Sequence, residues 1–198
     1  MKTDFLTPES PRYGEVQTHI QRIYHDAYGA SIQNFAPLLV ACSNSQGDIM
    51  CAAGIRTSAD GFFSDAYLND DLSSTILART GQVVDASEII EVVSLASATP
   101  FPVLAMLDAM IHWGRTQGMS LGIFTATGKL RHLLGRAKLP YAALCPANPA
   151  RIADPDNWGS YYDTDPWVCA FREDYCTPVT LSPRNRAVGV EQVSGGLS

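Results

Sequence analysis

The chain has 198 residues, of which 46% are apolar and 17% are charged, and its formal net charge is −6. This size suffices for one domain with a well-buried core, and the negative charge argues against a nucleic-acid-binding protein. No apolar stretch approaches the roughly 18 residues that span a bilayer, and the first residues lack the pattern of a signal peptide. We therefore expect a cytoplasmic protein with no stable membrane insertion.

The cysteines and histidines indicate no cofactor site. The chain has five cysteines, an odd number, and none of them has C-x-x-C spacing, so neither a disulfide framework nor a zinc site is predicted. The histidines show no metal-like spacing with carboxylates, and we predict no metal and no bound cofactor. Cys42 and Cys51 should lie on neighbouring strands, where packing is the expected use and a cross-strand contact is the alternative.

The first half of the chain predicts a helix followed by a hairpin. Apolar residues at helical spacing predict a helix that begins after Pro11 and ends before Gly29. Two apolar strands over 37–42 and 49–56, joined by a polar turn, predict a hairpin. The aromatic segment 62–68 is predicted to be a strand end or a loop. The rest of the pattern predicts helices over 71–80, 102–117 and 129–138, and strands over 87–95, 119–125 and 141–144.

Strands and helices alternate after the hairpin, which defines the fold class. The strands around Ile89 and Ile123 should be parallel neighbours joined by a crossover helix. We predict an α+β fold with three layers, in which a mixed, twisted sheet carries helices on both faces. One domain is expected over 1–176, followed by an extended or disordered tail over 177–198.

Glu91 is the most informative single residue. It lies in the apolar run 89–93, where an isolated ionised carboxylate is costly to bury. Its presence indicates a water-filled groove, a partner cation or a role in proton transfer. Glu91 could act as a general base whose pKa is raised by burial. Alternatively, it could pair with an arginine, such as Arg56, for structural reasons.

Several segments together resemble the thermostable hemolysin family of bacterial proteins. They are 87–96, 122–127 and 158–166, with Tyr28-Gly29-Ala30 and Ala66-Tyr67-Leu68, and the Trp-Gly-Ser-Tyr-Tyr run that begins at Trp158 is the most specific. The resemblance covers nearly the whole chain apart from its ends. It implies a fold like that of the GNAT acyltransferases and, among them, the acyl-homoserine-lactone synthases, in which a strand ends beside a splayed groove for an acylated pantetheine arm.

The resemblance also implies roles, and the sequence departs from it at several points. Glu91 stands where the lactone synthases have a functional glutamate, but Ser94 stands where they have arginine. Residues 93–94 are Val-Ser where the hemolysin family usually has Gly-Asn. The turn 96–102 lacks glycine, although GNAT enzymes carry a glycine-rich phosphate loop there. Leu133-Leu134 occupies the place of a tyrosine acid that many GNATs have. A pantetheine carried by an acyl carrier protein has no pyrophosphate, so it needs no phosphate-binding backbone at this turn, unlike coenzyme A.

The acyl donor is expected at the ends of two neighbouring strands. Backbone N–H groups of Leu95, Ala96 and Ser97 would polarise the thioester carbonyl. The small residues Thr125, Ala126 and Thr127 end the next strand, and ligands in such sheets bind beyond the carboxyl ends of parallel strands. They would leave room for the pantetheine arm; the alternative is a plain strand-to-helix turn that Thr127 caps.

The acceptor or acyl pocket is expected to involve one acid and three aromatic residues. Asp65 would attract an amine. Trp158, Tyr161 and Tyr162 could line the pocket, or they could pack in the core, where phenols need a polar partner.

A basic helix face is the candidate docking surface for a carrier protein. Lys129, His132 and Arg136 share one face of the predicted helix 129–138, with Arg131 nearby. Their charge could steer an acidic acyl carrier protein toward the groove. A solvated helix face is the alternative.

We therefore predict an N-acyltransferase that moves an acyl group from acyl carrier protein or acyl-coenzyme A to a small amine. One alternative is a membrane-active, hemolysin-like protein, although the sequence shows no spanning helix and no long amphipathic hairpin. Haemolysis could also arise indirectly from a surfactant-like acyl amide. A second alternative is an inactive fold that binds an acyl ligand.

Overall fold

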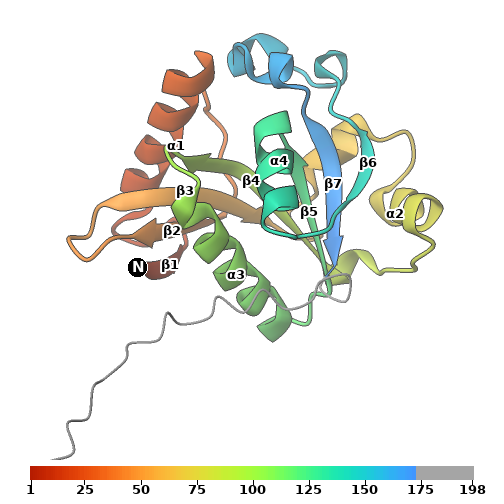
Figure 1. Cartoon of the computed structure of the whole chain (residues 1–198), viewed down its shortest axis with the longest axis horizontal. Helices are drawn as coiled ribbons and strands as arrows, with labels where there is room; N and C mark the ends of the chain where they lie inside the picture. The colour runs from red at the N-terminus through yellow and green to blue at the C-terminus, as the bar shows by residue number, and fades with distance from the viewer. Residues whose placement is uncertain (173–198) are drawn as a thin grey trace, which may run out of the picture.

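The structure, a computed structural model, describes residues 1–172. The predicted tail over 177–198 and the last residues of the predicted domain lie outside the described residues. The described part is built on one seven-stranded sheet with strand order β1-β2-β3-β4-β5-β7-β6 (Figure 1). The strands are β1 (Lys2–Leu6), β2 (Leu38–Ser43), β3 (Ile49–Arg56), β4 (Ile89–Ser97), β5 (Leu121–Ala126), β6 (Ala142–Pro146) and β7 (Trp167–Arg172). The helices are α1 (Tyr13–Tyr28), α2 (Leu72–Thr80), α3 (Phe101–Thr116) and α4 (Gly128–Arg136).

The sheet is mixed, as the sequence predicts. β4 and β5 pair in parallel, with Ile89 opposite Leu121 and Glu91 opposite Ile123. The other neighbouring strands pair antiparallel, including the predicted hairpin of β2 and β3. The crossover helix α3 joins the two parallel strands, and it begins at Phe101, with Pro102 in its first turn, a position where proline costs no hydrogen bond.

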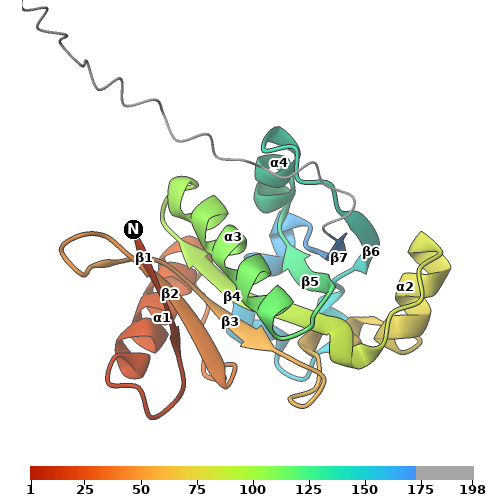
Figure 2. The ribbon, with the colours of Figure 1, turned by 90° about the horizontal axis from the view of Figure 1, so that it is seen from below.

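Helices cover both faces of the sheet (Figure 2). α1 packs over β2, β3 and β4 through Val16, Ile20 and Tyr24, and α2 packs on the same side against β4 and β5 through Leu72 and Ile76. α3 and α4 pack on the opposite side. The predicted three-layer arrangement is therefore confirmed for the described part of the chain.

Three elements differ from the prediction. β1 and β7 were not predicted as strands, and the segment predicted as a strand end or loop forms a 3-10 helix, η1 (Phe63–Tyr67). β1 is a short edge strand in which Lys2 is exposed, the next three residues are half-buried and only Leu6 is buried, so it has little apolar pattern. β7 fits between β5 and β6, a place that only the tertiary fold defines. Cys42 and Cys51 lie opposite each other across β2 and β3 as free, buried thiols, so they pack in the core and are cross-strand neighbours as well.

An irregularity in β4 creates the opening that positions the candidate site. Gly54 of β3 pairs with Val93 and Ala52 pairs with Ala96, so Ser94 and Leu95 face a single residue of β3 in a β-bulge. Ser94 has φ of 52°, a left-handed conformation that is uncommon for a residue with a side chain. At the same place β4 separates from β5: the last parallel pair joins Val92 to Phe124. The two strands therefore diverge beyond this pair.

Candidate functional site

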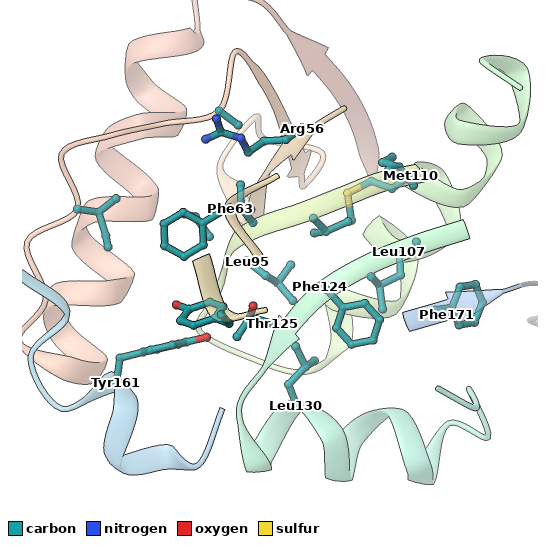
Figure 3. A pocket seen from close by; sticks show the side chains of 18 of the residues that line it. Arg56, Phe63, Leu95, Leu107, Met110, Phe124, Thr125, Leu130, Tyr161 and Phe171 are labelled. Atoms are coloured by element: carbon teal, nitrogen blue, oxygen red, sulfur yellow. The ribbon is translucent and has the colours of Figure 1, made fainter. Parts of the chain in front are cut away.

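A cavity of about 410 Å³ passes through the sheet where β4 and β5 diverge. Its centre is lined by Val93, Ser94 and Leu95 from the bulge and by Thr125 from β5. Figure 3 shows Leu95 and Thr125 between two groups of side chains, one on each side. We call these two parts of the cavity the apolar arm and the aromatic arm.

The apolar arm lies on the side of α3 and α4. Leu107 and Met110 of α3, Phe124 of β5 and Leu130 of α4 project into it (Figure 3). Its further lining is mostly apolar and includes Ile111, Gly114, Met119, Leu134, Leu139, Tyr141 and Phe171, with Arg115 and Ser120 as polar members. An arm of this composition suits a flexible hydrocarbon chain, because it buries apolar surface and offers few polar partners.

The aromatic arm lies on the side of α1 and η1. Tyr24, Phe63, Tyr67, Trp158 and Tyr161 line it, and the rings pack together, with centroids 5.3 Å apart for Trp158 and Tyr161 and 5.7 Å for Phe63 and Trp158. The lining of the same arm also includes polar residues. They are Ser31, Gln33, Asn34, Arg56, Asp154 and Asn157.

The tryptophan-glycine-serine segment joins this arm to the end of α1. The backbone N–H of Ser160 donates to the carbonyl of Tyr28 at 2.9 Å, and that of Ser31 donates to the carbonyl of Asn157 at 2.7 Å. Gly159 has φ of 52°, and a Cβ there would lie 2.1 Å from the carbonyl oxygen of Tyr28. Only glycine therefore fits at this position, where two of the segments of the resemblance contact each other.

Glu91 lies one layer behind the wall of the aromatic arm. It is 1% exposed and is absent from the cavity lining. The backbone N–H of Phe63 donates to its Oε2 at 2.6 Å, and the backbone N–H and the hydroxyl of Ser64 donate to its Oε1. Burial raises the pKa of Glu91, and these hydrogen bonds oppose the shift.

Arg56 is not the direct structural partner of Glu91. The two residues face each other across β3 and β4, and the charge of Arg56 lowers the pKa of Glu91 slightly against the effect of burial. Instead, Arg56 donates from Nε to the carbonyl of Gly61 and from Nη2 to that of Asp60, each at 2.9 Å. Glu91 and Arg56 therefore do not form the ion pair given above as the alternative. The carboxylate of Glu91 instead accepts hydrogen bonds from the backbone of η1.

The predicted donor residues divide into two groups. Leu95 and Thr125 line the cavity. Ala96 and Ser97 pair with β3, Ala126 is buried, and none of these three lines the cavity. Thr127 is the N-cap of α4, where its side chain accepts a hydrogen bond from the N–H of Leu130 at 3.3 Å, as the capping alternative predicted.

The predicted acceptor residues divide in the same way. Trp158 and Tyr161 line the aromatic arm, whereas Tyr162 and Asp65 do not. The hydroxyl of Tyr162 lies 2.6 Å from that of Tyr67, so the pair satisfies both phenols in the core. Asp65 is an exposed residue of η1. The prediction missed Arg56, Phe63 and Tyr67 as lining residues, because no periodic pattern marks them in the sequence.

Three of the four predicted docking residues share a shallow depression. Lys129, His132 and Arg136 line it together with Pro100, Gly128 and Leu133. Arg131 points elsewhere: it forms an ion pair with Asp165 at 2.6 Å and donates to the carbonyl of Ala126 at 3.1 Å. The exposed basic surface, called the basic patch below, therefore consists of Lys129, His132 and Arg136.

Within residues 1–172 no group of three or more His, Cys, Asp and Glu side chains is placed to hold a metal ion. Over the same residues, none of the helices combines the length and apolar character needed to cross a membrane.

Solved structures of acyltransferases share this fold. The AHL synthase LasI superposes with a TM-score of 0.59 at 8% identity, over 86% of this chain and 89% of its own. FeeM, an N-acyl amino acid synthase from uncultured soil microbes, gives 0.57 at 12% identity, over 86% and 92%. MesI, a CoA-dependent acyl-homoserine lactone synthase, gives 0.52 at 12% identity, over 90% and 91%. The protein therefore has the fold of the GNAT acyltransferases.

The sequence assigns the chain to one family among the proteins with this fold. It matches the thermostable hemolysin family over residues 6–175, and the chain belongs to this family. The predicted resemblance is thus confirmed both for the family and for the fold. No curated protein matches the sequence.

Proposed function

We propose that this protein is an N-acyltransferase that moves an acyl group from a pantetheine thioester to an amine. The observation that carries the proposal is the two-armed cavity that crosses the sheet at the β4 bulge. A thioester and an amine have to meet at one point while their remaining parts are held separately. The apolar arm suits the acyl chain, and the aromatic arm suits the acceptor.

The bulge is the proposed place of the thioester carbonyl. The amine nitrogen attacks the carbonyl carbon, the C–S bond breaks, and the thiolate leaves and takes up a proton as the amine loses one. Negative charge develops on the carbonyl oxygen, and backbone N–H groups at the bulge, at Leu95 in particular, would stabilise it. The pantetheine amides can pair with the edges of β4 and β5, which do not pair with each other beyond Val92 and Phe124.

An acyl carrier protein is the proposed source of the pantetheine. A pyrophosphate needs backbone N–H groups at the start of the following helix, but Pro100 and Pro102 flank the first residue of α3 and have no N–H to offer. The basic patch lies beside Pro100, and its charge is complementary to an acidic carrier protein. Coenzyme A, which the name of MesI associates with that protein, is the alternative donor.

Glu91 is the proposed proton acceptor for the amine. Its pKa is raised by burial, which moves a carboxylate toward the range that suits a general base. Because Phe63 and Ser64 occupy its oxygens, proton transfer would need Phe63 to move aside, either for direct contact or for an intervening water molecule. A purely structural Glu91 is the alternative that the experiments below separate.

A protein that binds an acyl ligand without turnover is the second candidate. The covered position of Glu91 favours it, because the carboxylate is absent from the cavity lining. A directly membrane-active protein is a third outcome, which the family description "thermostable hemolysin" raises.

One experiment separates these functions. Purified protein is incubated with acyl carrier protein or coenzyme A, each loaded with a long acyl chain, and with a panel of amines. Native mass spectrometry reports donor binding, and thiol release reports turnover. We expect binding of the carrier-borne donor and amine-dependent thiol release. Binding without release would support the acyl-binding module, and lysis of erythrocytes by the protein without any donor would support direct membrane activity.

A further inference from the structure

Arg56 places a guanidinium group at the aromatic arm of the cavity (Figure 3). Two backbone carbonyls, those of Gly61 and Asp60, hold its Nε and Nη2 at 2.9 Å. A guanidinium has five N–H donors, and Nη1 makes no hydrogen bond to any residue of the described chain. Arg56 is therefore held in a fixed orientation with donors to spare.

No carboxylate within residues 1–172 neutralises this charge by an ion pair. The side chain of Asp60 accepts hydrogen bonds from the backbone and the hydroxyl of Thr57. The carboxylate of Glu91, which faces Arg56 across the two strands, accepts from Phe63 and Ser64. Glu91 acts on Arg56 only across the strands and without an ion pair. Neutral carbonyls orient a guanidinium and leave donors available, so a half-buried arginine of this kind can bind an anionic ligand.

The geometry of the group favours a carboxylate. The planar fork of arginine matches the two oxygens of a carboxylate in bidentate pairs. Around it, Phe63, Tyr67 and Trp158 offer ring surfaces to an apolar body. The cavity centre at Leu95 and Thr125, where the proposed transfer occurs, lies between this arm and the apolar arm (Figure 3).

We propose that the acceptor amine also bears a carboxylate, as an α-amino acid does, and that Arg56 binds this carboxylate. The apolar side chain of the acceptor then lies among the aromatic rings, and its amine points toward the thioester. This inference rests on the proposed function for the transfer step. The carboxylate site itself can be tested without turnover.

The transfer test uses acceptors that differ only at the carboxylate. Thiol release from the acyl donor is measured with phenylalanine, phenylalaninamide and phenethylamine, and with the leucine series. We expect the free amino acids to react with kcat/KM at least roughly 30-fold above that of their amides. Arg56→Gln should remove this preference mainly through KM, and Arg56→Lys should restore part of it. Arg79→Gln, an exposed arginine of α2, is the matched control and should keep the preference.

The binding test uses product analogues and separates the two hypotheses. Calorimetry compares an N-acyl-phenylalanine with its carboxamide on the wild type, Arg56→Gln and Arg56→Lys, after circular dichroism has confirmed that each is folded. Selective, Arg56-dependent binding without turnover would support the carboxylate site and contradict the proposed function. Turnover of amides and simple amines as fast as amino acids, unchanged in both Arg56 variants, would overturn this inference and leave the proposed function standing.

Discussion

Phe63 donates its backbone N–H to Glu91 at 2.6 Å, while its ring lines the aromatic arm. The buried carboxylate thus fixes the position of one wall of the cavity, and Ser64 strengthens the link with two further hydrogen bonds. Glu91 can therefore affect activity in two ways, by accepting a proton or by holding η1 in place. Variants of Glu91 and of its partner Ser64 can separate these roles.

Replacing Glu91 with glutamine should destabilise the protein by about 2–3 kcal/mol, because one amide oxygen cannot accept from both backbone N–H groups and one of them stays buried and unpaired. Ser64→Ala removes only the hydroxyl donor and should cost about 1 kcal/mol. Chemical denaturation measures both values.

If Glu91 is the base, Glu91→Gln also lowers single-turnover rates by about 10²–10⁴-fold, whereas Ser64→Ala does not. Rates that simply follow stability in both variants would assign Glu91 a structural role.

The raised pKa of Glu91 predicts a specific pH dependence of stability. Between the ordinary glutamate pKa of 4.5 and the raised folded value, the folded state binds more protons than the unfolded state, so stability falls as pH rises through this window. Above the window this contribution is constant. Denaturation curves measured across it should have a negative slope in the wild type that becomes shallower in Glu91→Gln. A general base must be ionised, so kcat/KM should rise over the same window.

Gly159→Ala tests the junction between α1 and the tryptophan-glycine-serine segment. A Cβ there meets the carbonyl oxygen of Tyr28 at 2.1 Å, and we expect a loss of about 3 kcal/mol or more together with a disordered aromatic arm. Gly81→Ala is the matched control, because Gly81 also has positive φ, 74°, but nothing lies within 4 Å of its Cβ position. It should cost only about 1–2 kcal/mol. Equal losses in the two variants would contradict the steric explanation.

The basic patch should govern the use of a carrier-borne donor. Lys129→Glu and Arg136→Glu are expected to raise KM for acyl carrier protein by about tenfold at low salt, since rim charges act mainly on encounter, and high salt should reduce the difference. Neither change should affect transfer from a free acyl-pantetheine, which has no protein to dock. Arg79→Glu, on the exposed side of α2, is the control. Equal effects on both donors would show that the basic patch does not bind the carrier protein.

The sequence predicted the central architecture because its signals are local. Long apolar runs mark the parallel strands around Ile89 and Ile123, and Pro102 and Gly118 mark the ends of the crossover helix. β1 lacks such a signal because Lys2–Leu6 is a short edge strand, whereas β7 contains the apolar run Trp167–Phe171, which the prediction overlooked. Their places in the sheet depend on tertiary pairing.

The candidate site could be predicted only in part for a related reason. Leu95 and Thr125 line the cavity as expected, since strand ends can be read from the sequence and ligands bind there. Phe63 and Arg56 reach the aromatic arm through η1 and the turn at Gly61, and no spacing rule reveals that arrangement. Residues expected beside Leu95, such as Ala96, are excluded because the ladder with β3 resumes immediately after the bulge.

Gly114 offers a test of the apolar arm as the acyl site. It lines the cavity, and a Cβ there would meet Met119 and Ile90 at 3.7–3.8 Å, which is ordinary contact. Gly114→Ala should therefore fit and, inside a helix, stabilise by about 0.5–1 kcal/mol. Gly114→Leu adds further atoms that fill the arm, so turnover should fall for long acyl donors and stay near wild type for short ones. A uniform loss across chain lengths at unchanged thermal stability would place the acyl chain elsewhere.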